Sequence, residues 1–147
     1  MTNPGKEDPM STRSRLTVPV LALAAVSLVL GCGGGDGDEG IELELAAQAD
    51  SGQSGIATLT PIGAETTRVV VELSDPPRAP QPSHIHSGTC DEIGEVVAPL
   101  NSLVDGRAET TVPSSLDELQ RGGLIVHAHK SEDESDVSVA CAPIPTR

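Results

Sequence analysis

The 147-residue sequence contains no phenylalanine, tyrosine or tryptophan. Aromatic side chains normally supply the largest single blocks of buried surface, so the core has to be built from Val, Leu, Ile and Ala. An aliphatic core is thin in a chain of this length, and a covalent cross-link would add to its stability.

Positive charge is also scarce. The chain has nine Lys and Arg residues against 22 Asp and Glu, which gives a formal net charge of −13 at pH 7. Nucleic-acid binding needs a basic surface, so nucleic acid is excluded as an expected partner. Anionic substrates would meet an unfavourable mean field, whereas cations would be attracted. Hydrolysis is not indicated either, because Ser87, Ser114 and Ser138 lie in no nucleophile motif.

The N-terminal region lacks an apolar run long enough to span a bilayer comfortably. Residues 18–31 are apolar, follow Arg13 and Arg15 and end in a small residue, which predicts a signal peptide over residues 1–31. The sequence Val-Leu-Gly-Cys at residues 29–32 resembles a bacterial lipobox, in which the cysteine, here Cys32, receives lipid. An ordinary signal peptide with a coincidental cysteine is the alternative, and Met10 is an alternative start.

Residues 32–40 are predicted to be a flexible tether, because glycine and acidic residues cannot bury surface. Lipid on Cys32 would make the membrane a partner and place the protein outside the cytoplasm of a bacterium. Gly33 after the lipidated cysteine favours the outer membrane or cell surface over the inner membrane where a cell has two. Residues 41–147 then form one domain.

Cysteines are few, and their number is informative. With Cys32 assigned to lipid, Cys90 and Cys141 remain, and an even remainder outside the cytoplasm predicts a disulfide. The chain-entropy model gives such a long loop roughly 4 kcal/mol of stabilisation. Two free, buried thiols are the alternative.

The hydrophobic pattern is that of strands rather than helices. Residues 41–45 alternate apolar and acidic side chains, and residues 66–74 are rich in β-branched residues. Four prolines predict a loop over residues 75–82, and capping residues predict one or two helical turns within 114–123. Further strands are expected at residues 55–60 (ending at Pro61), 83–87, 96–100, 106–113, 123–130 and 136–143. Such a series predicts an all-β antiparallel sandwich or barrel.

All four histidines lie in two His-x-His pairs, His84 with His86 and His127 with His129. On a strand each pair points to one face, and adjacent strands lie about 4.8 Å apart, so three or four imidazoles could converge. Neutral imidazole suits copper or zinc. Solvated histidines on an exposed sheet face are an equally good interpretation of the spacing.

The segments HIHSGTC (84–90), IVHAHKSEDE (125–134) and VACAPI (139–144) resemble Cu/Zn superoxide dismutase and the related CHRD domains. The resemblance covers about residues 55–145. It implies an eight-stranded Greek-key sandwich, the disulfide Cys90–Cys141, and copper ligands at His84, His86 and His129. His127 has no counterpart in the enzyme, and we expect it to act as a fourth ligand because it points the same way as His129.

The departures from the family limit the expected chemistry. The segment after Cys90 contains no histidine, so the zinc subsite and the bridging histidine are missing, and copper is the expected metal. Ser138 stands where the family has the arginine that receives superoxide, and Lys130 is followed by acids. The leading hypothesis is therefore a membrane-anchored lipoprotein with a dismutase-like domain that binds copper without being an efficient dismutase. A copper-only superoxide dismutase and a metal-free CHRD-like structural or interaction module are the alternatives.

Overall fold

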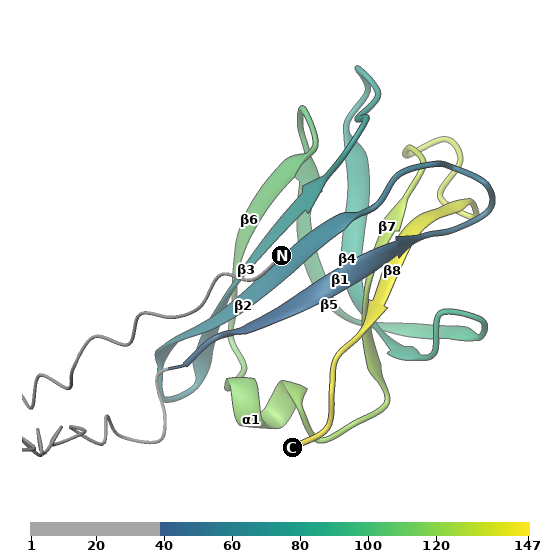
Figure 1. Cartoon of the computed structure of the whole chain (residues 1–147). Helices are drawn as coiled ribbons and strands as arrows, with labels where there is room; N and C mark the ends of the chain where they lie inside the picture. The colour runs from purple at the N-terminus through teal and green to yellow at the C-terminus, as the bar shows by residue number, and fades with distance from the viewer. Residues whose placement is uncertain (1–38) are drawn as a thin grey trace, which may run out of the picture. The chain divides into compact units, whose positions relative to one another are not determined.

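The computed structural model describes residues 39–147, so the predicted signal peptide, Cys32 and most of the predicted tether lie outside the described residues. The described part is almost entirely antiparallel β-structure (Figure 1). Its strands are β1 (Ile41–Ala47), β2 (Gly55–Gly63), β3 (Thr66–Leu73), β4 (Gln81–Gly88), β5 (Ile93–Leu103), β6 (Arg107–Val112), β7 (Leu124–His129) and β8 (Ser138–Pro143). The one described α-helix, α1 (Leu116–Leu119), is the predicted helical turn, and the side chain of Ser115 caps its N-terminus.

The strands form one eight-stranded sheet in the order β5-β4-β7-β8-β1-β2-β3-β6. β1 joins its two halves, because its first five residues pair with β2 and its last two pair with β8. The outer strands β5 and β6 are connected by a tight turn, and Asn101 of β5 hydrogen-bonds to Thr110 and Glu109 of β6. The sheet is therefore nearly closed into a barrel, and the all-β prediction is confirmed.

The barrel interior is aliphatic, as the composition requires. Leu43 and Leu45 of β1 are buried, whereas Glu42 and Glu44 are exposed. The alternating residues that predicted this strand therefore face the interior and the solvent in turn. Valine, leucine, isoleucine and alanine from all eight strands and α1 make up the core cluster.

Three strands differ from their predicted ranges by three residues or more, whereas the other five differ by one or two. β2 continues through Pro61 to Gly63 because a bulge in its pairing with β3 accommodates the proline. β4 begins at Gln81, inside the predicted loop, because the buried amide of Gln81 exchanges hydrogen bonds with that of Gln53. β5 has 11 residues rather than five and is exposed over most of its length, so hydrophobicity alone underestimated it.

The predicted disulfide is present. Cys90, in the turn after β4, is bonded to Cys141 of β8, 51 residues further along the chain. Cys141 is buried, but it is not part of the main core cluster. It pairs in register with His127, so the disulfide fastens the β4–β5 turn to the sheet next to the histidines.

Candidate metal centre

Strand alternation places all four histidines on the same face of the sheet. Ile85 and Ala128, which lie between the members of each pair, are fully buried in the core cluster. The histidines therefore point outward from the barrel, and His84 pairs in register with His127 across the β4–β7 ladder. This confirms the predicted orientation of the two His-x-His pairs.

The outer face is nevertheless not a solvated one at this position. His86, His127 and His129 are buried, with 6%, 1% and 8% of their surface exposed, and His84 is partly exposed. Ile125, the register partner of His86, is also buried on this side. The interpretation of these residues as exposed surface histidines is therefore wrong for three of the four.

β-Bulges occur next to two of the histidines. The β4–β5 pairing shifts register on both sides of His86, and the β7–β8 pairing shifts between Ala128 and His129. A bulge bends its strand and redirects the neighbouring side chain. The bulges therefore supply the local adjustment that lets side chains from two strands converge.

His84, His86 and His129 form one compact group. Each offers one ring nitrogen, and these three nitrogens lie within 4.8 Å of one another. Nδ1 of His84 is 3.1 Å from Nε2 of His129. If both nitrogens bound one ion at about 2.05 Å, this separation would correspond to an angle of about 100° at the ion, between square and tetrahedral coordination. The spacing fits a single small metal ion.

The orientation of His86 fits the same assignment. Its Nδ1 lies 3.0 Å from the carbonyl oxygen of Gly94, so Nδ1 carries the proton and donates to this oxygen. Nε2 then presents a lone pair, and it is buried with no hydrogen-bond partner among the described residues. Leaving such an atom unpaired costs about 1–3 kcal/mol, which a bound cation would offset.

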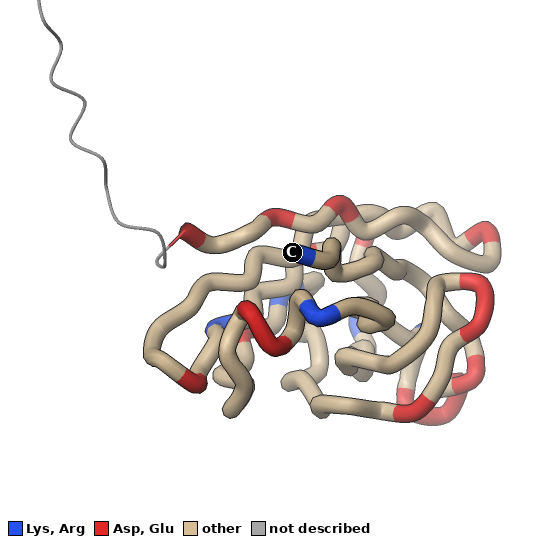
Figure 2. The backbone as a smooth tube through the Cα atoms, turned by 90° about the horizontal axis from the view of Figure 1, so that it is seen from below, with Lys and Arg blue, Asp and Glu red and all other residues tan. Residues whose placement is uncertain are grey.

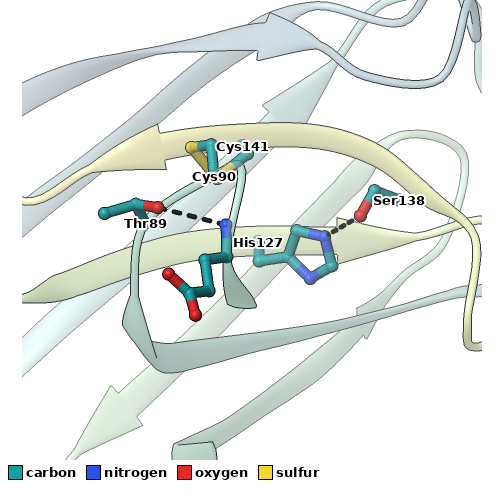
Figure 3. The surroundings of a disulfide bond; sticks show 6 residues. Thr89, Cys90, His127, Ser138 and Cys141 are labelled. Carbon is teal, nitrogen blue, oxygen red and sulfur yellow. Dashed lines mark hydrogen bonds between the residues drawn. A yellow bond between two sulfur atoms is a disulfide. The ribbon is translucent and has the colours of Figure 1, made fainter. Parts of the chain in front are cut away.

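His127 lies beside this group but not within it. Its ring centroid is 4.4 Å from that of His129, and its Nε2 is 2.6 Å from Oγ of Ser138 on β8 (Figure 3). Nδ1 of His127 is buried without a partner among the described residues. The hydroxyl of Ser138 thus holds one nitrogen of His127 away from the group of three, and a role as fourth ligand stays a prediction.

The neutral imidazole is favoured at His84, His127 and His129. Burial, followed by the charges that His129, His86 and His84 would carry, lowers the pKa of His127 from 6.5 to about 4. Burial is also the main cause that lowers the pKa of His84, with His129 and His86 adding to it. Burial and the charge of His86 lower the pKa of His129, whereas the backbone of Ser135 raises it. Nδ1 of His129 has no hydrogen-bond partner among the described residues. Neutral imidazole is the form that binds metals.

These pKa shifts predict that the metal-free chain loses stability in mild acid. Because the pKa of His127 is about 4 in the folded state and about 6.5 when unfolded, the unfolded chain binds more protons between these values. The free energy of unfolding should therefore fall as the pH drops through this window, and the melting temperature of chelator-treated protein should be several degrees lower at pH 5 than at pH 7.5. His127→Gln should reduce the difference, and an equal difference in that variant would contradict the assignment.

No protein-family model, characterised protein or solved structure matches this chain. The likeness to the dismutase and CHRD families accordingly rests on the sequence segments quoted above. Among residues 39–147, no helix has the length and apolar character needed to cross a membrane.

Two contributors to the site were not predicted from the sequence. Gly94 orients His86 through its carbonyl oxygen, and Ser138 binds His127 through its hydroxyl. In the sequence, Ser138 lies outside any nucleophile motif and at the position of the family's arginine, and neither observation predicts a bond to His127. A backbone carbonyl has no signature in the sequence, and the Ser138 contact depends on the register of β8.

Proposed function

We propose that this protein binds copper through His84, His86 and His129 in a lipid-anchored, extracytoplasmic domain. The observation that supports the proposal most directly is the convergence of three imidazole nitrogens within 4.8 Å, two of the three residues being buried. Nδ1 of His84 and Nε2 of His86 and His129 are the donor atoms that this geometry favours.

The donor set favours copper over other divalent ions. The group consists of neutral nitrogen donors, and both cysteines of the described residues are in the disulfide. Sites of this kind bind first-row divalent metals most tightly when the metal is copper. Three ligands also leave coordination positions open, which suits an ion that is exchanged.

The proposed fold is the Greek-key arrangement of the Cu/Zn superoxide dismutase family. Its support is the strand order, in which β6 returns to pair with β3 after β4 and β5 have joined the other half of the sheet. Connections that cross between the two halves in this way are typical of Greek-key topologies.

The proposed location follows from the sequence before residue 39 and has weak support from the disulfide. Disulfides persist in oxidising compartments outside the cytoplasm. Lipid on Cys32 would hold the domain at the membrane, with the outer membrane or the cell surface as the expected site in a bacterium with two membranes.

The test is a copper titration of the full chain with the Cys90–Cys141 disulfide formed, and zinc is the control metal. We expect one copper ion per chain with a dissociation constant below about 1 µM, and weaker binding of zinc. The absorption of the bound ion reports binding directly. Absence of saturable copper binding would reject the proposal and favour the metal-free structural module, in which the hydrogen bond between His84 and His129 would fix the two strands.

A copper-only superoxide dismutase is the second candidate, because a three-histidine site leaves room for a small ligand on the metal. Measurable dismutation by the copper-loaded chain, lost in His129→Gln, would establish it.

A further inference from the structure

Acidic residues dominate the end of the barrel at which β7 stops. Four loops meet there, formed by residues 48–54, 74–80, 104–106 and 130–137, and hydrogen bonds join them to one another and to the strand ends. They contain seven carboxylates and two cations: Asp50, Asp75, Asp105, Glu132, Asp133, Glu134, Asp136, Arg78 and Lys130. Lys130 is paired with Glu134 at 2.7 Å, so its charge is largely compensated.

The last of these loops is next to the histidines. It leaves β7 at His129 and enters β8 at Ser138, which pairs in register with His129. Glu132, Asp133 and Asp136 are exposed in this loop and form no ion pair with any described residue. No neighbouring cation in the described part of the chain therefore neutralises the negative charge of these three side chains, which lie in the loop next to the histidine cluster.

A second acidic segment borders the cluster at His86. Asp91, Glu92 and Glu95 are exposed and flank Gly94, whose carbonyl oxygen orients His86. No Lys or Arg occurs between His86 and Arg107. A run of acidic segments is visible along the right-hand edge of the molecule in Figure 2.

The open side of the cluster is at His84. His86 and His129 are buried, whereas His84 is partly exposed, so an incoming ion or ligand meets His84 first. One acidic segment follows His129 and the other flanks Gly94, so both lie next to the cluster. Carboxylates grouped around an opening raise the local concentration of cations and lower that of anions.

We propose that the histidine cluster is a cation-capture site that admits copper as a positively charged species and excludes small anions, superoxide among them. This inference rests on the proposed function, since it assigns the charge class of what enters the copper site. It is carried by two independent observations. The buried Nε2 of His86 has no partner among the described residues, and the two acidic segments next to the cluster carry carboxylates that form no ion pair there. The function it favours is uptake or transfer of the metal.

The first test measures the association rate of Cu²⁺ with the full chain at low and at high salt. The Debye length falls from about 30 Å at 0.01 M to about 10 Å at 0.1 M, so a rate that depends on the acidic segments should fall about tenfold or more between 0.01 and 0.3 M salt. The variant E132Q/D133N/D136N should bind several-fold more slowly at low salt and show a weaker salt dependence. All three side chains are exposed, so its fold should be preserved.

The matched control is E39Q/E42Q/E65Q, which removes the same charge at the opposite end of the barrel. Glu39 and Glu42 lie where the chain enters β1, and Glu65 is in the β2–β3 turn. This control should keep most of the rate and most of its salt dependence. Equal effects of the two triple variants, or a rate independent of salt, would overturn the inference while leaving copper binding intact. Failure of the unmodified chain to bind copper in the equilibrium titration would reject the proposed function itself.

The second test uses azide as a small anionic probe of the copper-loaded chain. Azide should bind weakly to the unmodified chain and several-fold more tightly to E132Q/D133N/D136N. Tight azide binding to the unmodified chain, or efficient dismutation of superoxide, would show that anions reach the metal and would overturn the exclusion.

Discussion

Replacing His84 by alanine is expected to lower the affinity for copper by at least about 100-fold. Removing even a residue that only supports a ligand typically lowers metal affinity 10- to 100-fold, so removing one of three ligands should cost at least the upper value. His84 is the ligand best suited to this test because it is partly exposed, so its truncation leaves no cavity in the core. The measurement is a competition titration against a copper chelator of known affinity.

The controls distinguish a ligand from a neighbour. His129→Gln should reduce the affinity for copper as strongly as His84→Ala. Nδ1 of His84 and Nε2 of His129, which lie 3.1 Å apart, would both bind the ion. His127→Gln should reduce it less than tenfold if the hydroxyl of Ser138 keeps His127 out of the coordination sphere. A loss as large as that of His84→Ala would make His127 a fourth ligand. Unchanged affinity in both His84→Ala and His129→Gln would remove the histidine cluster as the copper site.

Removing the disulfide is expected to lower the melting temperature by roughly 15 °C. The bond closes a loop of 51 residues, which corresponds to about 4 kcal/mol in the chain-entropy model, and 1 kcal/mol shifts the melting temperature of a domain of this size by about 4 °C or more. The variant C90A/C141A, and the unmodified chain in reductant, should show this shift in thermal denaturation followed by circular dichroism.

Reductant should have no further effect on C90A/C141A, which is the control for non-specific effects. The loss should be large because no aromatic side chain contributes to the core. If the melting temperature of the unmodified chain is the same with and without reductant, the disulfide contributes nothing to the stability of the folded state.

The sequence predicted those features that depend on local periodicity and on residue type. Alternation along β4 and β7 placed His84 and His86 on one face and Ile85 in the core, and it did the same for the second pair and Ala128. The disulfide followed from the number of cysteines that remain once one is assigned to lipid.

Features that depend on contacts between distant segments were not predictable in the same way. The burial of His86 and His129 on the outer face is a property of the assembled sheet, and the bulges next to them depend on how β4 pairs with β5 and β7 with β8. A bulge adds one residue to one strand, and no single residue type in this chain marks its position. The length of β5 was missed because its exposed residues contribute to the barrel through backbone pairing rather than through hydrophobic burial.

The aliphatic core has a consequence for the proposed binding of a redox-active ion. Copper that cycles between its two oxidation states generates reactive oxygen species, which damage the histidines that hold the metal and, elsewhere, chiefly the side chains of Met, Cys, Tyr and Trp. Residues 39–147 contain no Met, Tyr or Trp, and both cysteines are already oxidised in the disulfide. The core on the inner face of the sheet therefore contains only aliphatic side chains, so the same composition that makes the core thin also makes it resistant to oxidative damage.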